Sequence, residues 1–191
     1  MPVTLADGTV VSKDDGPRAS STVEKLATLE PAFREGGSVT AGNACPLNDG
    51  AAACLIMSAE KAAELGLKPR ARIISAATWG NEPEYMGVAP IGAIKKALER
   101  AELTIDDIDV VELNEAFAAQ VIPIADECGI DMAKLNPNGG AIALGHPFGM
   151  TGVRMMATLL NDLESSGGRY GVETMCVAQG QGEAMVVESL K

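Results

Sequence analysis

The chain has 191 residues, enough for one domain and an appendage. With 47% hydrophobic and 21% charged residues, it has the composition of a globular protein with a core and not of a disordered tail. The formal net charge of −11 argues against a nucleic-acid partner, because phosphate binding needs a basic face. A small anionic ligand is not excluded, since backbone N–H groups and a few cations are enough to hold one.

Aromatic residues are few, so the core must consist mainly of Ala, Val, Ile, Leu and Met, which suits helices packed on a sheet. No two of the four cysteines have C-x-x-C spacing, and reduced thiols in a cytoplasmic protein are expected. No apolar run is as long as a membrane span, and the start of the sequence lacks a signal-peptide pattern, so no membrane association is expected.

The first part of the chain differs from the rest. Residues 1–45 contain the turn-forming segments Asp7-Gly8 and Asp15-Gly16-Pro17 and have room for one short helix within residues 21–33. We place a domain boundary near Cys45–Pro46, which divides the chain into residues 1–45 and 46–191.

After this boundary, helical and strand patterns alternate. The predicted helices cover residues 49–65, 90–101, 115–128 and 151–164, and the predicted strands cover residues 72–78, 109–113, 171–177 and 184–189. Alternation of this kind predicts an α/β layered domain. Because a short turn joins the last two strands, they should be antiparallel and the sheet should be mixed.

The only histidine, His146, lies in the Gly-rich segment GGAIALGHPFGMTG. A lone histidine is usually an ordinary, partly buried side chain. Here the glycines allow close backbone approach, and the helix predicted from Thr151 points its N-terminus toward the loop. Such a loop is suited to hold an imidazole and backbone donors in a defined place.

Two further polar residues stand at strand ends. Cys176 follows an apolar strand and precedes a Gly-rich turn, so it is either a buried small hydrophobe or a proton-transfer partner of His146. Asn114 is either the N-cap of the next helix or an amide aimed at a polar site at the carboxyl end of its strand.

Two other chemistries are weaker. The turn GQGEA lacks the third glycine and the following helix that a dinucleotide-binding fold requires. A zinc site made of Cys45, His146 and Cys176 has no ligand spacing to support it, so no metal is predicted.

Four segments taken together resemble the thiolase family. They are VTAGNACPLNDGAAA at 39–53, NEAF at 114–117, NGGAIALGHPFGMTGVR at 138–154 and CVAQGQG at 176–182. The resemblance runs from about Pro2 to Glu188. Thiolases are larger, with two similar α/β halves and an inserted loop domain. The resemblance implies that residues 1–45 are the end of the loop domain and that residues 46–191 are the C-terminal domain, a layered mixed sheet covered by helices that forms one half of the full fold. The acyl-accepting cysteine would then lie in the other half.

The resemblance implies an acyltransferase of fatty acid or lipid metabolism that acts on coenzyme A thioesters. It would either cleave a 3-ketoacyl-CoA with coenzyme A or condense two acetyl-CoA molecules, with coenzyme A as a substrate and no further cofactor. His146 would be the base that activates the missing cysteine and would line an oxyanion hole. Cys176 would carry a proton, and Asn114 would position a water that donates to the thioester oxygen.

The same resemblance assigns substrate contacts. The residues expected along the pantetheine arm of coenzyme A are Phe33, Cys45, Met86 and Phe117. Ala178 would give its backbone N–H to a second oxyanion hole. Here Cys45-Pro46 replaces the usual Ser-Gly, and Ala178-Gln179 replaces Gly-Gly, while Glu183 adds a negative charge near Cys176.

The expected partners are acyl-CoA, coenzyme A, and either the missing N-terminal half or a second copy of the chain in a homo-oligomer. An alternative function is a non-catalytic thiolase-like protein that binds acyl-CoA or a partner. A ketoacyl synthase is disfavoured by the NEAF segment and by Cys176.

Overall fold

The centre of the molecule is a four-stranded mixed sheet, seen here in a computed structural model that describes residues 2–14 and 16–190. Its strands are β3 (Ala71–Gly80), β4 (Val110–Leu113), β5 (Tyr170–Val177) and β6 (Gln181–Ser189). They lie in the order β3-β6-β5-β4, with β4 and β5 parallel and the other pairs antiparallel. The predicted mixed sheet and its antiparallel final strands are therefore confirmed.

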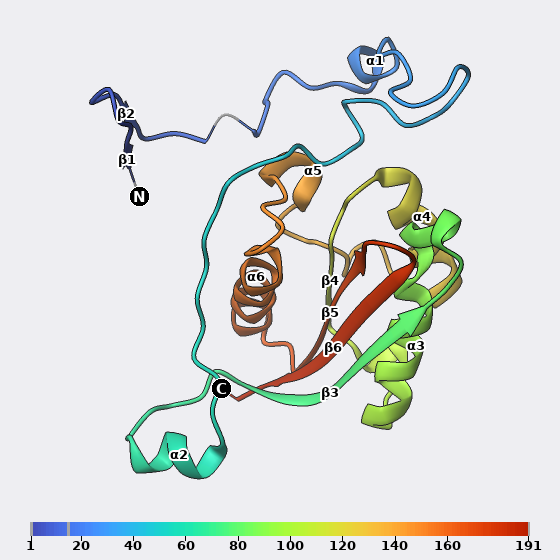
Figure 1. Cartoon of the computed structure of the whole chain (residues 1–191). Helices are drawn as coiled ribbons and strands as arrows, with labels where there is room; N and C mark the ends of the chain where they lie inside the picture. Colours follow the sequence, from blue (N-terminus) through green and yellow to red (C-terminus); the bar gives the residue numbers. More distant parts are fainter. Residues whose placement is uncertain (1, 15, 191) are drawn as a thin grey trace.

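Helices cover both faces of this sheet. On one face lie α3 (Pro90–Ala101) and α4 (Ala118–Cys128), and on the other lies α6 (Thr151–Ser166) (Figure 1). All four residues of β4 are buried, as expected for a strand with helices on both sides. The larger part of the core lies between the sheet and the α3–α4 layer, and a smaller cluster that includes Leu159 and Leu163 lies under α6.

Helix α3 shows how local sequence sets an element. It begins with Pro90, whose fixed φ suits the first helical position, and it ends at Glu102 in the left-handed conformation. Its buried side chains follow the spacing of a helix that packs one stripe on a core, and they include Ala93, Ile94 and Ala97. The predicted bounds of 90–101 match the observed ones.

The remaining elements are short. They are β1 (Val3–Thr4), β2 (Val10–Val11), α1 (Val23–Leu26), α2 (Ala59–Glu64), η1 (Pro83–Val88), η2 (Ile105–Asp107) and α5 (Ala141–Leu144). The described residues before α2, 2–14 and 16–58, form an extended arm that passes α5 and runs along the outside of α6 (Figure 1). We call it the N-terminal arm.

Two helix predictions were wrong. The helix expected at 49–65 is only α2, which Ser58 caps and not Asp49. Leu55 and Ile56, in the preceding segment, are 84% and 74% exposed, so there is no packing surface to stabilise a helix there. The helix expected from Glu115 begins only at Ala118, with Phe117 as its N-cap, so Asn114 is not a capping residue.

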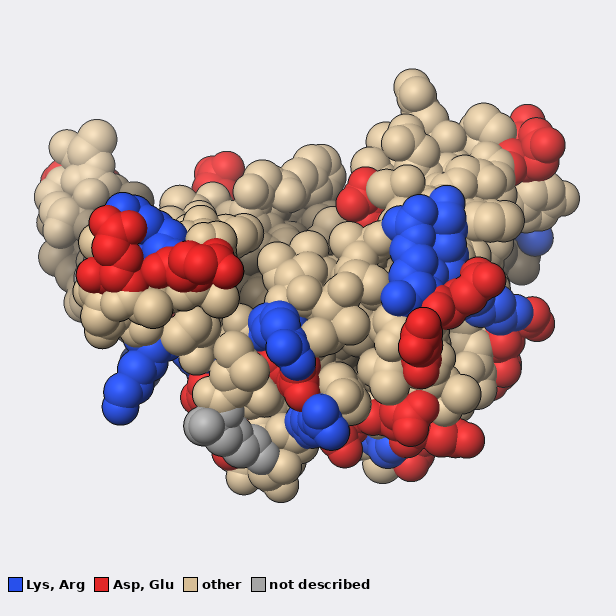
Figure 2. Space-filling view, turned by 90° about the horizontal axis from the view of Figure 1, so that it is seen from below, with Lys and Arg blue, Asp and Glu red and all other residues tan. Residues whose placement is uncertain are grey.

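The surface carries charges of both signs. On the face seen from below, Lys and Arg side chains lie among Asp and Glu side chains (Figure 2), within a chain whose formal net charge is −11. Among the helices of the described residues, none is long and apolar enough to cross a membrane.

Candidate active site

The loop between α5 and α6 places His146. Gly145 has φ +95°, and a Cβ atom added there would overlap the side chain of Asn48, so this position requires glycine. The backbone N–H of His146 donates to Asn48 Oδ1 at 3.3 Å, which ties the loop to the N-terminal arm. The Pro147 carbonyl then accepts from the backbone N–H of Thr151 at 3.1 Å and starts the first turn of α6.

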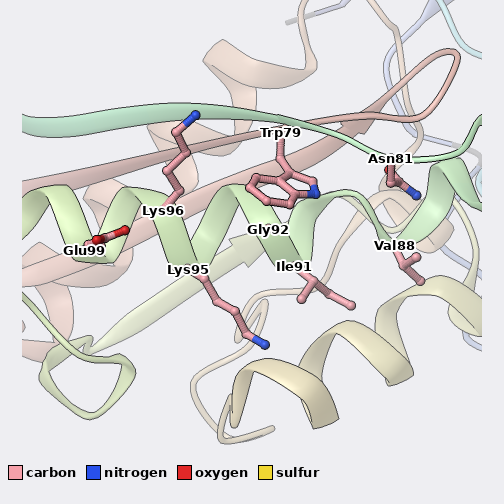
Figure 3. A pocket seen from close by; sticks show the side chains of 8 residues that line it. All are labelled: Trp79, Asn81, Val88, Ile91, Gly92, Lys95, Lys96 and Glu99. Atoms are coloured by element: carbon pink, nitrogen blue, oxygen red, sulfur yellow. The ribbon is translucent and has the colours of Figure 1, made fainter.

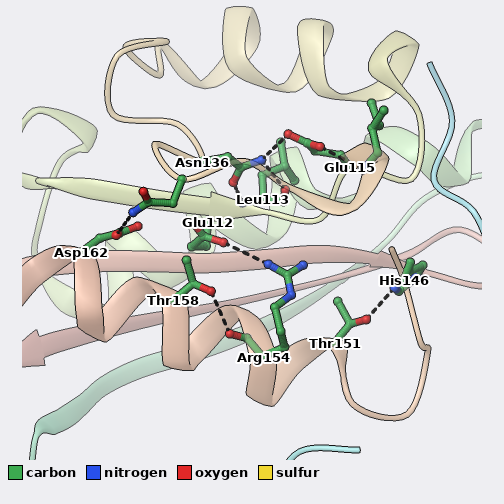
Figure 4. Close-up of polar contacts among 11 residues, drawn as sticks. Glu112, Leu113, Glu115, Asn136, His146, Thr151, Arg154, Thr158 and Asp162 are labelled. Carbon is green, nitrogen blue, oxygen red and sulfur yellow. Dashed lines mark hydrogen bonds and ion pairs between the residues drawn. The ribbon is translucent and has the colours of Figure 1, made fainter. Parts of the chain in front are cut away.

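Two hydrogen bonds hold the imidazole of His146. Its Nδ1 lies 2.7 Å from Thr151 Oγ1 (Figure 4). Its Nε2 lies 3.2 Å from Asn114 Nδ2. Thr151 Oγ1 uses its only proton to donate to the Pro147 carbonyl at 2.9 Å, so it accepts from Nδ1–H of the histidine. Nε2 is then the unprotonated nitrogen, and it accepts from the Asn114 amide.

The surroundings keep this imidazole neutral. Burial lowers the pKa of His146, and the positive charge of Arg154 lowers it further. A neutral imidazole with a free lone pair on Nε2 is what a general base needs near pH 7.

Asn114 sits at the end of β4, with 1% of its surface exposed. Its backbone N–H donates to Thr174 of β5 at 3.0 Å. The neighbouring residue Leu113 is braced by Asn136, whose side chain accepts from Leu113 N at 2.8 Å and donates to Leu113 O at 2.9 Å. Within the described residues Asn114 Oδ1 has no hydrogen-bond partner, which leaves it able to accept from a water or a ligand.

Sequence reasoning missed Thr151 and Asn136, although both carry a local signal. Thr151 begins the helix that follows the histidine loop, so its hydroxyl faces back toward that loop. Asn136 precedes the Gly-rich segment and has φ +44°, a conformation that asparagine tolerates better than most residues.

The two cysteines named from the sequence lie in different segments near the β4–α4 loop. Cys176 is half-buried near the end of β5, and burial raises the pKa of its thiol, with Cys45 adding to the rise. The backbone N–H of Cys45 donates to the Ala116 carbonyl at 3.0 Å, which places the arm beside the NEAF segment. Because burial raises its pKa, the Cys176 thiol is protonated at neutral pH. Proton transfer between His146 and Cys176 stays a prediction.

Several residues named for the pantetheine arm gather near the start of α4. The rings of Phe33 and Phe117 meet edge to face with their centres 5.9 Å apart. Phe117 also lines a hollow of about 190 Å³ together with Gln120 and two neighbours of Met86. Ala178 is exposed in the β5–β6 turn. The contacts of these residues with coenzyme A stay predictions.

A larger hollow of about 620 Å³ lies between β3 and α3 and is lined in part by Trp79, Lys95 and Lys96 (Figure 3). It includes none of the residues named above. Both lysines have partners, because Lys95 pairs with Glu127 at 2.7 Å and Lys96 donates to the Thr78 carbonyl at 3.3 Å. In the described part of the chain, no group of three or more His, Cys, Asp or Glu residues is arranged to hold a metal ion.

Comparison with known families agrees with the geometry of the fold. The model of the thiolase C-terminal domain matches residues 67–189, and the model of the thiolase N-terminal domain matches residues 1–60. The chain belongs to the thiolase family. The domain boundary near Cys45–Pro46 stays a prediction.

Named relatives of this thiolase chain include the beta-ketoadipyl-CoA thiolase of Acinetobacter baylyi, 52% identical over 98% of this chain and 48% of that protein. The acetyl-CoA acetyltransferase of Syntrophomonas wolfei is 53% identical over 95% of this chain and 46% of that protein. The thiolase chain thus spans about half the length of the curated relatives it matches.

Solved structures confirm the thiolase fold. The acetyl-CoA acetyltransferase of Bacillus anthracis superposes with a TM-score of 0.94 at 46% identity, covering 100% of this chain and 49% of that one. Human mitochondrial 3-ketoacyl-CoA thiolase in complex with CoA superposes with a TM-score of 0.93 at 40% identity, covering 99% and 48%.

Proposed function

We propose that this chain supplies the proton-transfer half of an acyltransferase that acts on coenzyme A thioesters, by 3-ketoacyl-CoA thiolysis or by acetyl-CoA condensation. The observation that carries the proposal is the imidazole of His146, neutral and held by Thr151 and Asn114 with Nε2 as its basic nitrogen, in a chain of the thiolase family. The acyl-accepting cysteine would come from a second polypeptide segment that corresponds to the other half of the relatives.

In the thiolysis direction, His146 takes the proton of that cysteine, and the sulfur attacks the keto carbonyl of the substrate. The bond between the α-carbon and the keto carbon breaks, which leaves the acyl group on the cysteine and an enolate of acetyl-CoA. The Cys176 thiol protonates the enolate carbon. Preorganised donors stabilise the negative oxygens, with Asn114 acting through a water and Ala178 through its backbone N–H.

In the second step, the Cys176 thiolate takes the proton of an incoming coenzyme A thiol. The coenzyme A sulfur attacks the acyl group, and the cysteine leaves and recovers its proton from His146. Each residue thus returns to its starting state, and condensation is the same sequence reversed. The side chains of Phe33, Cys45, Met86 and Phe117 would contact the pantetheine arm of coenzyme A during both steps.

The test is reconstitution of a complete enzyme. The chain is co-expressed with the N-terminal half of the A. baylyi thiolase, and cleavage of acetoacetyl-CoA and of 3-oxoadipyl-CoA by coenzyme A is followed. We expect turnover only in the complex, because the chain by itself has no acyl-accepting cysteine. In the complex His146→Ala should lower the rate by about 10²- to 10⁴-fold while the two halves still copurify. Turnover by the chain alone, or a fully active His146→Ala complex, would overturn the proposal.

A second candidate is a non-catalytic protein that binds acyl-CoA or a partner. It is favoured by the β5–β6 turn, where Gln179 has φ +67° at a position for which the family pattern has glycine. Binding of acetyl-CoA measured by calorimetry, with equal affinity in the His146→Ala variant and no turnover of either substrate in the complex, would support this candidate.

A further inference from the structure

A pair of buried glutamates lies beneath the imidazole site. In the parallel pairing of β4 and β5, Glu112 is directly opposite Glu173. Only 1% of Glu112 and 9% of Glu173 is exposed. The other cross-strand neighbour of Glu173 is Met185, which carries no charge. Two acidic side chains therefore share one dry patch of the sheet.

In the part of the chain that the structure describes, one cation lies beside this pair. Arg154, on α6, places Nη1 at 3.6 Å from Glu112 Oε2, and its side chain is 18% exposed (Figure 4). A Cβ atom added to Gly152 would lie 3.5 Å from Glu173 Oε1, so the first turns of α6 lie close over the glutamates. The other ionisable groups that bear on Glu112 are Asp162 of α6 and Glu115 of the β4–α4 loop, and both are acidic.

Among the described residues, two buried carboxylates and one guanidinium leave one negative charge without a partner. A buried charge of this kind is costly, so the group takes up a proton instead. Burial, and then the nearby Glu112, raise the pKa of Glu173 to about 8, and Arg154 opposes this. Burial raises the pKa of Glu112 to about 7, and the neighbouring Arg154 lowers it. Because Arg154 lies beside Glu112, Glu173 is the acid of the two that more readily keeps its proton.

Both ends of the ion pair connect to the histidine. Thr151, which accepts from His146 Nδ1, is three residues before Arg154 and so one turn away on the same helix. Asn114, which donates to His146 Nε2, is two residues after Glu112. Successive side chains of a strand alternate between the two faces of the sheet. The side chains of Glu112 and Asn114 therefore lie on the same face, the one that α6 covers.

We propose that Arg154 and Glu112 are positioning residues for His146, and that a proton held by Glu173 allows their ion pair to remain buried. The pair fixes the first turns of α6 against β4, and thereby fixes the two side chains that select one tautomer of the imidazole. This deepens the proposed function, because it names the residues that hold the proposed base.

The test uses the fact that His146 is the only histidine of the chain, so its ring nitrogens give a single set of signals in a long-range ¹H–¹⁵N spectrum. The wild-type chain should show one tautomer with the proton on Nδ1. Arg154→Met should give a mixture of both neutral tautomers, as for an unconstrained ring. Glu173→Gln, which mimics the protonated acid, should leave the wild-type spectrum unchanged at pH 7.

A matched control is Lys95→Met, which removes the cation of an exposed pair with Glu127 and should leave the ring unchanged. If Arg154→Met does not fold, Arg154→Gln replaces it, because the shorter, neutral side chain removes the ion pair with Glu112 but keeps a polar group at this position. A single Nδ1–H tautomer in the folded Arg154 variant would overturn the positioning role. A mixture in Glu173→Gln would overturn the proton on Glu173. Neither readout depends on turnover, so an inactive reconstituted complex would count only against the proposed function.

Discussion

The Nδ1 atom of His146 lies 2.7 Å from the Oγ1 atom of Thr151, the first residue of α6. The start of this helix therefore fixes the position of the imidazole. Because the Thr151 hydroxyl already donates to the Pro147 carbonyl, it accepts only the Nδ1–H tautomer. Thr151, in the first turn of α6, thus determines that Nε2 is the unprotonated nitrogen and is able to act as a base.

Replacing Thr151 by valine should release the ring. The change keeps the shape of a fully buried side chain but leaves Nδ1–H without an acceptor. An unsatisfied buried donor costs about 1–3 kcal/mol. We expect this decrease in the free energy of unfolding, measured by urea denaturation, together with a mixture of tautomers in the nitrogen spectrum.

Thr158→Val is the matched control for that change. Thr158 is also on α6, and its hydroxyl donates to the Arg154 carbonyl at 3.1 Å, just as the Thr151 hydroxyl donates to the Pro147 carbonyl. Unlike Thr151, it does not contact the histidine. It should alter stability by no more than about 0.5 kcal/mol and leave the ring unchanged. Equal effects of the two substitutions would contradict the role of Thr151.

Stability should fall as the pH rises through the range set by Glu173. Its folded pKa of about 8 is above the ordinary value of 4.5, so the folded chain binds this proton more tightly than the unfolded chain. The resulting stabilisation is complete below pH 4.5 and is lost as the pH rises to about 8. The loss reaches at most about 1.4 kcal/mol per pH unit. Urea denaturation at a series of pH values measures it.

Glu173→Gln should weaken this dependence, because the amide has no proton to lose. The slope that remains comes from Glu112, whose pKa burial raises to about 7. Glu183→Gln, an exposed acid two residues into β6, is the control and should leave the slope as it is in the wild type. The same slope in Glu173→Gln and in the wild type would show that Glu173 is ionised in the folded chain.

Much of the fold was predictable because its signals are local. The Pro90 start and the apolar stripe of α3 gave that helix its bounds. Strands β5 and β6 were recognisable from apolar runs on either side of a Gly-containing turn. The residues His146 and Asn114 were chosen from loops at element ends, and they do meet at 3.2 Å.

The remainder depended on contacts between distant segments. A helix was expected at 49–65 because Asp49 suits an N-cap and Gly66 suits a helix end. Helices in proteins are stabilised mainly by packing, however, and the exposed residues around Leu55 and Ile56 have no surface to pack on. The Glu112–Glu173 pair was not predictable either, because it follows from the register between two strands that are far apart in sequence.

Gln179→Gly should stabilise the chain. Gln179 has φ +67° in the turn between β5 and β6, where a residue with a Cβ atom pays about 1 kcal/mol or more relative to glycine. Part of that gain is offset by the greater freedom of glycine in the unfolded chain, so we expect a net gain of about 0.5 kcal/mol in the free energy of unfolding. Ala178→Gly, at the adjacent position without positive φ, should instead destabilise the chain, and a gain in both variants would contradict the strain at Gln179.

The chain by itself should associate with itself. Within the N-terminal arm, the run at residues 51–56 lies outside helices and strands and is apolar and exposed, with Leu55 at 84% and Ile56 at 74% exposure. An unpaired apolar segment of this kind favours association, because burying it removes apolar surface from water. We expect a homodimer or larger assembly in light scattering, burying at least roughly 1,000 Å² in a stable interface.

Ile56→Asp should shift the population toward the monomer, whereas Val23→Asp, a similarly exposed position on α1, should change it less. A monodisperse monomer of the unmodified chain at high concentration would rule out this association, and co-expression with the N-terminal half of a relative should suppress it if that half covers the same run.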